Sequence, residues 1–272
     1  MKVVYVGGGN MAAAMIGGGV RAGAASGDIA VVEPSAERRA LLTRDFGVVT
    51  HAAPGPFAAA ADLIVLAVKP QQMRAACTAL RPHVGAATVV SVAAGIRVAH
   101  LTRWLATDQV VRAMPNTPAL IGAGVSGLVA HAAVAPARRA LAEQLLSATG
   151  TVVWFAQDAE LDAVTAISGS GPAYVFAFIE ALMRAAAELG LPDAAARTLA
   201  VHTVLGAGKL AAQSAEPIAV LRERVTSKGG TTAAGLASLA QDGFSDAVVR
   251  AARAACARAQ QMADEFGAEP PA

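Results

Sequence analysis

Charged residues are scarce in this chain of 272 residues, where Asp, Glu, Lys and Arg together make up 15% of the sequence. Ordinary soluble domains carry about a quarter. The formal net charge is only +2, and the arginines are scattered rather than gathered into a basic stripe among aromatic side chains. This composition does not indicate a nucleic-acid partner. The chain also lacks an uninterrupted apolar run of about twenty residues, so no membrane-spanning helix is expected.

Cysteine is scarce as well. Cys77 and Cys256 stand far apart, and neither belongs to a C-x-x-C pair. The histidines show none of the short spacings typical of metal ligands. They are His51, His83, His100, His131 and His202. We expect these residues to pack in the interior or lie on the surface, and we predict no metal site. A chain without a disulfide framework fits a reducing, cytoplasmic compartment.

Apolar residues, in contrast, make up 55% of the chain, and glycine is not counted among them. A chain of 272 residues has room for one large domain or two ordinary ones, and two domains is the default expectation. This apolar content is more than one soluble monomer is expected to bury in its own core. We therefore expect interfaces between subunits.

A glycine-rich turn follows the first strand-like run. Residues 2 to 6 are mostly β-branched, residues 7 to 12 form the turn, and residues 13 to 16 have the composition of a helix start. The turn contains the three small residues of a G-x-G-x-x-G/A dinucleotide fingerprint. The start of the helix would face a pyrophosphate with free N–H groups and a positive dipole end. The predicted cofactor-binding residues here are Gly7, Gly8, Gly9, Asn10, Met11 and Ala12.

Two simpler interpretations of this segment remain open at this point. A lysine followed by apolar and small residues up to Ala22 is compatible with a secretory signal peptide, although the glycines and Asn10 interrupt its hydrophobic region. The glycines could also form only a tight structural turn, because a lone fingerprint is weak. The choice between these interpretations depends on the motifs in the rest of the chain.

Glu33 ends the second strand-like run, residues 28 to 33, at about the distance past the glycines where an acidic residue meets the adenine ribose. Glu33 would favour the 2′-hydroxyl of NAD. Ser35, Arg38 and Arg39 just beyond it would instead hold the 2′-phosphate of NADP. A solvated glutamate at a strand end has the same appearance. The sequence predicts a cofactor contact for Glu33 and Ser35 and leaves the choice between NADPH and NADH open.

Strands and helices alternate up to about residue 155. Residues 62 to 68 and 88 to 92 are continuous apolar runs, typical of strands buried on both faces. Ligands of doubly wound sheets bind beyond the carboxyl ends of such strands. We therefore predict that Ala67, Val68, Lys69 and Pro70 form a wall of the cofactor site, and that Ala93 and Ala94 let a ring lie close to the backbone. The sequence predicts an α/β Rossmann domain over residues 1–155.

Residues 156–272 contain no further strand-like run and are typical of helices separated by glycine and proline. We expect a short helix over residues 158–167, a turn at residues 168–172 and a longer helix over residues 173–190. The first two turns of the longer helix are apolar on every face, which requires neighbours all round. This part of the chain is predicted to be an all-α dimerisation domain.

A second loop-to-helix junction lies at residues 225–232, just before a helix predicted over residues 233–240. Hydroxyl side chains stand at or near the expected N-cap. Free N–H groups, a positive dipole end and these hydroxyls would together bind a small carboxylate. Two threonines that merely cap the helix would give the same pattern.

Five motifs taken together resemble pyrroline-5-carboxylate reductases along almost the whole chain. They are G-G-G-N-M-A at 7–12, A-V-K-P at 67–70, M-P-N-T-P at 114–118, S-G-S-G-P-A-Y at 168–174 and V-T-S-K-G-G-T-T at 225–232. Each motif alone is weak, but their order and spacing are specific. The resemblance implies reduction of 1-pyrroline-5-carboxylate to L-proline by NADPH or NADH, the last step of proline biosynthesis. It also implies a helical domain that interleaves with a second subunit, often within a ring of dimers.

The resemblance also implies roles for individual residues. The nicotinamide would lie near Ala93, Ala94, Pro115 and Asn116, and the imino acid would be held by Ser227, Gly230, Thr231 and Thr232. The family's acidic residue on the substrate side falls on Asp158, where glutamate is more usual. Lys228 stands where many relatives have proline.

The chemistry sets three tasks for such a site, because hydride arriving at the imine carbon leaves a nitrogen that needs a proton. Backbone amides at residues 230–232 would hold the carboxylate, and apolar walls would keep the ring flat against the nicotinamide. The Thr232 hydroxyl, or a water that it orients, would serve the nitrogen, either as a proton donor or by positioning the substrate. Two alternatives stay open: a reductase of another small imino or hydroxy acid, and a dinucleotide sensor without turnover.

Overall fold

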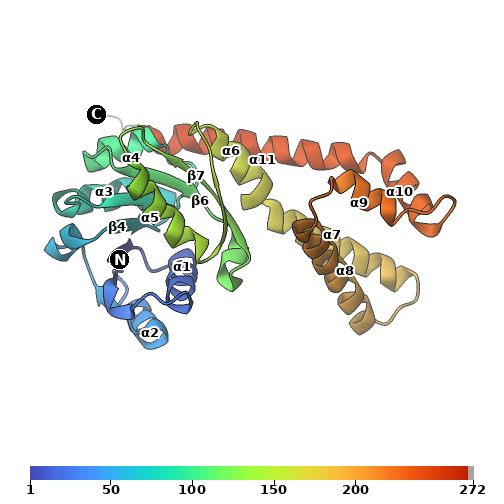
Figure 1. The fold of residues 1–272 in the computed structure, drawn as a ribbon, viewed down its shortest axis with the longest axis horizontal. Coiled ribbons are helices and arrows are strands. Elements are labelled where there is room, and N and C mark those ends of the chain that lie inside the picture. Colours follow the sequence, from blue (N-terminus) through green and yellow to red (C-terminus); the bar gives the residue numbers. More distant parts are fainter. Residues whose placement is uncertain (269–272) are drawn as a thin grey trace. The chain divides into compact units, whose positions relative to one another are not determined.

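Eight strands form one sheet in the order β3-β2-β1-β4-β5-β6-β7-β8 in the computed structural model, which describes residues 1–268 (Figure 1). β1 to β6 are parallel and follow the order 3-2-1-4-5-6 of dinucleotide-binding sheets. The predicted Rossmann domain is therefore confirmed. The strands are β1 (Val3–Val6), β2 (Ile29–Val32), β3 (Val49–His51), β4 (Leu63–Leu66), β5 (Thr88–Ser91), β6 (Val110–Met114), β7 (Gly124–Ala130) and β8 (Gly150–Trp154).

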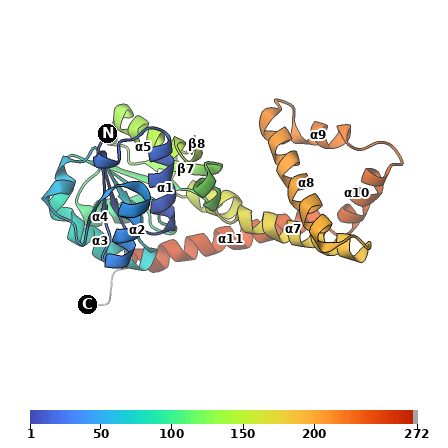
Figure 2. The same cartoon turned by 90° about the horizontal axis from the view of Figure 1, so that it is seen from below.

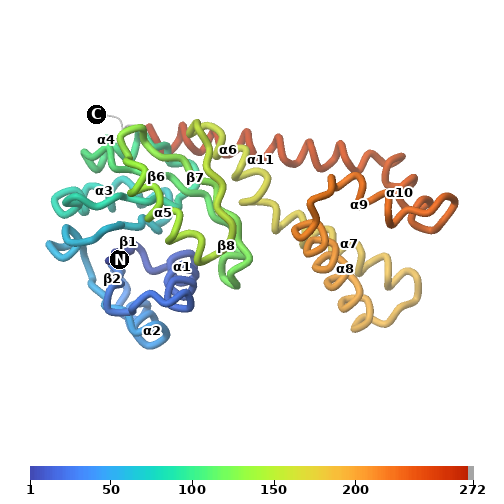
Figure 3. Tube along the Cα trace, viewed as in Figure 1, coloured from blue at the N-terminus to red at the C-terminus, as the bar shows by residue number. Residues whose placement is uncertain are grey.

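The far edge of the sheet departs from a purely parallel arrangement. β7 runs antiparallel to β6, and β8 runs parallel to β7. Figure 3 shows the path of the chain through these strands as a tube. A parallel crossover needs a dozen or more residues and usually a helix. The connection from β6 to β7 contains only the short 3-10 helix η5 (Thr117–Ile121), so the chain has to turn back.

The central strands are apolar because both of their faces are covered. In β1, Val3 and Tyr5 enter one core, and Val4 and Val6 enter the other, as the alternation of side chains along a strand requires. One face is covered by α1 (Asn10–Arg21), α2 (Ala36–Phe46) and α5 (Pro136–Ser147). The other face is covered by α3 (Met73–Leu80), α4 (Val98–Leu105) and α6 (Glu160–Val164).

The last helix, α11 (Phe244–Gly267), returns to the second face. Its C-terminal end lies beside α4 in both ribbon views (Figures 1 and 2), where Phe266 packs against the core and Arg103 Nη2 donates to the carbonyl of Gly267 at 3.2 Å. The short 3-10 helices are η1 (Ser26–Asp28), η2 (Pro56–Ala60), η3 (Pro70–Gln72), η4 (Arg81–His83) and η5.

The chain divides into two compact units. The first, called here the Rossmann unit, comprises Met1–Ser170 together with residues 254–268. The second, called the helical unit, comprises Gly171–Arg253, and no strand follows β8 within the described residues. The change from strands to helices thus occurs where the sequence indicates it, but α6 and the end of α11 belong to the Rossmann unit because they pack on the sheet. The helices that remain are α7 (Gly171–Glu188), α8 (Asp193–Gln213), α9 (Ile218–Arg224) and α10 (Thr231–Gln241).

The helical unit exposes much of its apolar surface. α7 and α8 pack against each other, and Phe178 lies 6.2 Å from Phe244 between ring centroids. Yet α7 has no buried residue, and Phe176 is 61% exposed. The predicted apolar helix is therefore present, and a single copy of the chain leaves its apolar side chains exposed.

The turn predicted at residues 168–172 is wrong. Residues Thr165–Gly169 form a π-helix, η6, closed by Ser170 N donating to the carbonyl of Thr165 at 2.8 Å, and α7 begins at Gly171. Pro172 lies in the first turn of α7, where a missing N–H is tolerated. The chain continues as a helix from α6 through η6 into α7, so the preference of glycine and serine for turns is overridden here.

Candidate active site

Gly7 makes a turn that only glycine can make. Its φ is +98°, and its N–H donates to the carbonyl of Val32 at 2.8 Å. A Cβ placed on Gly7 would lie 2.7 Å from the carbonyl oxygen of Ala67 at the end of β4. The glycine therefore brings the carboxyl ends of β1, β2 and β4 together, at the point where the strand order reverses.

Gly9 is the N-cap of α1 and has no side chain to satisfy the first N–H groups of the helix. The helix starts at Asn10, three residues earlier than the composition indicates. The N–H groups of its first turn, with the positive end of the helix dipole, remain free for an anion. The backbone is open at Gly9, where a Cβ would meet no atom within 4 Å, and this leaves room for a phosphate to approach.

A cleft of about 780 Å³ opens beside this turn within the Rossmann unit. It brings together eight of the predicted cofactor residues, from three different strand ends. These are Gly7, Gly8, Gly9, Glu33, Ser35, Ala67, Val68 and Lys69. Its remaining lining is mostly small and apolar, including Ala52, Ala53 and Pro54 after β3. A largely apolar cleft of this size next to a free helix N-terminus fits the size and charge of a dinucleotide.

Glu33 is held by the backbone around it. Its Oε2 accepts the N–H of Gly8 at 2.9 Å, and its Oε1 accepts the N–H of Ser35 at 2.9 Å. Arg38 Nε donates to the carbonyl of Gly8 at 2.6 Å, while Arg39 Nη1 donates to the carbonyl of Glu33 at 2.8 Å. A carboxylate and two guanidinium groups thus flank one end of the cleft, so both candidate groups for the ribose hydroxyl and for a 2′-phosphate are in place.

The other predicted cofactor residues lie outside this cleft. Asn10, Met11 and Ala12 are in the first turn of α1, where Ala12 is fully buried, and Pro70 opens η3. The remaining four follow the carboxyl ends of β5 and β6, at the same edge of the sheet. They are Ala93, Ala94, Pro115 and Asn116.

Both ends of the Asn116 carboxamide already have partners. Its Oδ1 accepts the N–H of Val125 at 2.9 Å, and its Nδ2 donates to the carbonyl of Ser168 at 3.1 Å. The side chain is 8% exposed. Asn116 therefore fastens its loop to β7 and to η6.

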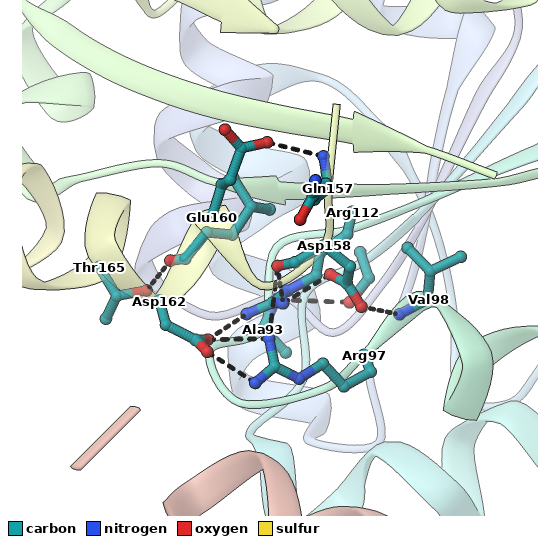
Figure 4. A network of polar contacts seen from close by, with 11 residues as sticks. Ala93, Arg97, Val98, Arg112, Gln157, Asp158, Glu160, Asp162 and Thr165 are labelled. Carbon is teal, nitrogen blue, oxygen red and sulfur yellow. Dashed lines mark hydrogen bonds and ion pairs between the residues drawn. The ribbon is translucent and has the colours of Figure 1, made fainter. Parts of the chain in front are cut away.

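Asp158 belongs to a partly buried network of two arginines and two aspartates, which Figure 4 shows. Arg112 Nη1 lies 2.7 Å from Asp158 Oδ1, and Arg97 Nη2 lies 2.6 Å from Asp162 Oδ2. The second oxygen of Asp158 accepts the N–H of Val98, the first residue of α4, at 2.9 Å. The charges balance within the network, which links β6, the loop before α4 and the start of α6.

Sequence reasoning did not find Arg97, Arg112 and Asp162. A signal was present, because Arg112 interrupts the apolar strand over residues 109–113, and a buried charge requires a partner. The sequence does not say which carboxylate supplies it. Asp158 was predicted instead to contact the substrate, whereas its carboxylate here pairs with Arg112 and caps α4.

The start of α10 in the helical unit presents the other predicted site. Gly230 is the N-cap, and no side chain caps the helix, so the hydroxyls of Thr231 and Thr232 are not spent on capping it. Both threonines are exposed. Ser227 is close by, since Gly230 N donates to its carbonyl at 3.0 Å and a Cβ on Gly230 would collide with Ser227 Oγ. Four predicted substrate residues thus converge on one helix N-terminus, an arrangement that can bind a carboxylate.

Comparisons with known proteins identify the family. The chain is 43% identical to the pyrroline-5-carboxylate reductase of Pseudomonas aeruginosa over 98% of each chain, and 40% identical to that of Pasteurella multocida over 97% of this chain and 98% of the relative. The chain belongs to the pyrroline-5-carboxylate reductase family. Residues 158–262 match the family described as pyrroline-5-carboxylate reductase dimerisation, and residues 2–95 match that described as NADP oxidoreductase, coenzyme F420-dependent.

Solved structures of pyrroline-5-carboxylate reductases share the fold. The enzyme from Coxiella burnetii superposes with a TM-score of 0.92 at 35% identity, covering 96% of this chain and 98% of that one. The Plasmodium falciparum enzyme, whose structure has NADP bound, gives a TM-score of 0.85 at 27% identity, over 97% and 98% of the two chains. The α/β nucleotide-binding domain followed by an all-helical dimerisation domain is therefore the fold of this reductase family.

One helical run, Glu160–Glu188, is long and apolar enough to cross a membrane by length and composition, although the sequence has no uninterrupted apolar stretch of that length. Only 6% of its most apolar window is buried. The run lies inside the matched dimerisation region of the reductase family. Its apolar surface is therefore explained by pairing with a second copy, and the protein forms a homodimer through this domain.

The cysteines and histidines lie outside the site described above. Cys77 is buried in α3, and burial raises the pKa of its thiol to about 12. His51 stacks on Phe57 with ring centroids 3.8 Å apart, and His100 stacks on Trp104. Among residues 1–268, no group of three or more His, Cys, Asp or Glu side chains is placed to hold a metal ion.

Proposed function

We propose that this member of the pyrroline-5-carboxylate reductase family binds NADPH or NADH in the cleft of the Rossmann unit and the imino acid at the start of α10. The reaction of the family is reduction of 1-pyrroline-5-carboxylate to L-proline, the last step of proline biosynthesis. The observation that carries the cofactor assignment is Gly7, whose turn closes the carboxyl ends of three strands around a helix N-terminus that no side chain caps.

The residues around the cleft fit a dinucleotide. The proposed contacts to its phosphates come from the first turn of α1 and the glycines before it, because free N–H groups and the helix dipole favour an anion there. Glu33 and Ser35 face the adenine ribose, and residues 67–70 form the wall beyond β4. Ala93, Ala94, Pro115 and Asn116 border the nicotinamide at the ends of β5 and β6. A bound NADPH or NADH supplies the hydride.

The proposed substrate site uses the helix start at residues 230–232. The N–H groups of Thr231 and Thr232 bind the carboxylate of the imino acid, assisted by the Ser227 hydroxyl. The Thr232 hydroxyl, or a water that it orients, hydrogen-bonds to the ring nitrogen that receives the proton. Threonine is a poor acid, so its role is mainly to position an imine that is already protonated in solution.

The choice of cofactor follows from the groups that flank the ribose. The NADP bound to the Plasmodium falciparum relative supports NADPH for this chain, and Arg38 and Arg39 supply positive charge at the same end of the cleft. Glu33 opposes a 2′-phosphate by its charge. We propose that NADPH and NADH are both accepted.

Assembly beyond the dimer and the compartment are also proposals. The exposed apolar side chains of the helical unit support a homodimer and its further association into a ring of dimers. The near-neutral charge and the two free cysteines support function in the cytoplasm without a nucleic-acid or membrane partner.

The test is an assay with 1-pyrroline-5-carboxylate and either nicotinamide cofactor, following oxidation of the cofactor and formation of L-proline. Proline that forms in step with cofactor oxidation supports the proposal. Cofactor binding without turnover would instead identify a sensor, and turnover only with another imino or hydroxy acid would identify a reductase of different specificity.

A further inference from the structure

Asn116 joins three segments of the Rossmann unit. Its Nδ2 donates to the carbonyl of Ser168 in η6, its Oδ1 accepts from Val125 N at the start of β7, and its own carbonyl accepts from Ala119 N in η5 at 3.1 Å. A carboxamide has one acceptor end and one donor end. An N–H on one side and a C=O on the other therefore fix its orientation.

The carbonyl of Ser168 lacks its usual hydrogen-bond donor within the helix. In an α-helix this carbonyl would accept the N–H of the residue four positions later. That residue is Pro172, which has no N–H. The π-helix η6 further shifts the local hydrogen bonds, as the bond from Ser170 N to Thr165 O shows. Asn116 Nδ2 thus supplies, from the end of β6, a hydrogen bond that the helix itself cannot supply from position 172.

The loop that Asn116 holds has neighbours on the cofactor side. It follows β6 at the carboxyl edge of the sheet, and η5, which starts directly after Asn116, packs against α1. α1 is the helix whose start faces the cleft. The loop also lies close to η6 at Gly169, where a Cβ would come 2.7 Å from the end of the Met114 side chain.

We propose that Asn116 is a positioning residue for hydride transfer, acting through its hydrogen bond to Ser168 O and not through a contact with the cofactor. The proposal rests on the proposed function, in which the loop of residues 114–116 borders the nicotinamide. The bond to η6 sets the depth of this loop against the sheet. A displacement of about 1 Å in such a wall lowers the rate of the chemical step by up to about a hundredfold.

The first variant is Asn116→Asp, which keeps the shape and the acceptor for Val125 N but removes the donor to Ser168 O. The readout is a single turnover, recorded as loss of reduced nicotinamide absorbance when enzyme that carries one bound cofactor per folded protomer is mixed with excess 1-pyrroline-5-carboxylate. We expect a rate constant at least about tenfold lower, with the same amplitude per protomer as the wild type. A purely structural role would lower the amplitude, as a smaller folded fraction, and leave the rate constant unchanged, which would overturn the proposal.

The matched control is Thr149→Val. Thr149 is also buried in the Rossmann unit, and its Oγ1 donates to the carbonyl of Leu146 at 2.7 Å. This variant loses one buried hydrogen bond beside the start of β7, where the carbonyl of Thr149 accepts the N–H of Gly124 at 2.9 Å, but it leaves the bond from Asn116 Nδ2 to Ser168 O in place. We expect a lower unfolding midpoint with a wild-type rate constant. A rate constant lowered as much as in Asn116→Asp would show that any buried defect suffices, which contradicts the proposal.

A second variant keeps the test decisive if the buried aspartate prevents folding. Asn116→Ala combined with Pro172→Ala offers Ser168 O a backbone N–H while leaving the loop untied. We expect this double variant to unfold at a higher temperature than Asn116→Ala alone, but to keep the low rate constant. A return to the wild-type rate constant would show that Asn116 only satisfies a carbonyl, and the proposal would fall.

The wild type, measured beside the variants, separates this inference from the proposed function. A wild type that does not oxidise the cofactor with 1-pyrroline-5-carboxylate overturns the proposed function. An active wild type with equal rate constants in the wild type and Asn116→Asp overturns only the role of Asn116.

Discussion

Arg112 and Asp158 form an ion pair inside the Rossmann unit, with 2.7 Å between Nη1 and Oδ1, and the arginine is only 1% exposed. The second carboxylate oxygen of Asp158 accepts the first N–H of α4. One aspartate thereby neutralises a buried charge in β6 and caps α4, a helix that packs on the sheet. These two contacts give Asp158 a structural role, so a direct contact with the substrate stays a prediction.

Replacing Asp158 tests both roles. Asp158→Ala leaves Arg112 with Asp162, 3.7 Å away, as its charged partner and with the backbone carbonyl of residue 158 at 3.2 Å. We expect the free energy of unfolding to fall by about 2–3 kcal/mol, below the usual range for a broken buried pair because Asp158 is 23% exposed and one hydrogen bond remains. Urea unfolding measures it. In the folded Asp158→Asn variant the KM for pyrroline-5-carboxylate should be unchanged. A raised KM would show that Asp158 contacts the substrate. Asp45→Ala, which breaks an exposed pair with Arg44, is the control and should change little.

Glu33→Gln should shift the cofactor preference toward NADPH. The carboxylate accepts the N–H of Gly8 at the edge of the cleft, and its negative charge repels a 2′-phosphate. The amide keeps the shape and removes the charge, and its single oxygen can accept one of the two N–H groups, of Gly8 and Ser35, that the carboxylate accepts. We expect the ratio of kcat/KM for NADPH to that for NADH to rise about tenfold, one charge interaction of about 1.4 kcal/mol. Steady-state kinetics with both cofactors measures the ratio, and an unchanged ratio would remove Glu33 from ribose recognition.

Thr232→Ala should lower kcat at least about tenfold, the low end of what a positioned hydrogen-bond donor contributes. Thr232 lies in the first turn of α10, where no side chain caps the helix. Loss of its hydroxyl therefore leaves the helix start intact. Thr226→Val, which loses a hydroxyl bonded to the carbonyl of Arg222, is a control expected to retain wild-type kcat. Unchanged turnover in Thr232→Ala would exclude the hydroxyl from the mechanism.

Phe176→Glu should weaken the dimer. Phe176 is 61% exposed on α7, within the matched dimerisation region, and a charge there would be buried without a partner in a helical interface. Light scattering should then detect a species of 27.2 kDa, the mass of one chain. Val49→Glu adds a charge at an exposed valine of β3 in the Rossmann unit and should leave the dimer intact. A wild type that is itself only 27.2 kDa would contradict the assignment.

Alkaline pH should destabilise the fold through Cys77 and Tyr5. Burial raises the pKa of the Cys77 thiol to about 12 and raises the pKa of the Tyr5 hydroxyl above its usual value. The unfolded chain loses these protons at lower pH than the folded chain, near about 8.5 for cysteine and about 10 for tyrosine. Stability is therefore full below about pH 8.5 and falls as the pH rises toward 12.

The free energy of unfolding measured in urea at several pH values above 8.5 checks this sign. Cys77→Ala should show a shallower decline, although it is less stable at neutral pH because it leaves a cavity. In the folded wild type, iodoacetamide at about pH 8 should leave Cys77 unmodified, since the thiol is neutral and enclosed. Rapid modification under these conditions would show that the site opens.

Local patterns sufficed for much of the fold and for the identity of many site residues. Continuous apolar runs of four to seven residues marked the strands, because strands covered on both faces are apolar throughout. Gly7 could be assigned from its spacing, since a tight turn beside a pyrophosphate excludes a side chain. The junction at residues 225–232 was recognisable because a glycine pair and hydroxyls precede a helical run, although α10 begins at Thr231, two residues before the expected start, and Gly230 is its N-cap.

Other features depend on partners that are remote in the sequence. The pattern Ser-Gly-Ser-Gly-Pro is typical of a turn, yet residues 165–169 form a π-helix held by Asn116 from the end of β6. The pairing of Arg112 with Asp158 joins residues 46 positions apart. No short-range propensity encodes such contacts, since they exist only once strands and helices have packed.

The sequence by itself determined that this protein has a nucleotide-binding α/β domain, a helical domain with too much apolar surface for one copy, and a helix start suited to a small anion. It could do so because strand burial, glycine turns and helix starts are set by residues close together in the chain. Only the tertiary structure decided that β7 turns back, that Asp158 neutralises Arg112 and that Asn116 holds η6. Those outcomes follow from burial of polar groups, which must find partners wherever the folded chain brings them within reach.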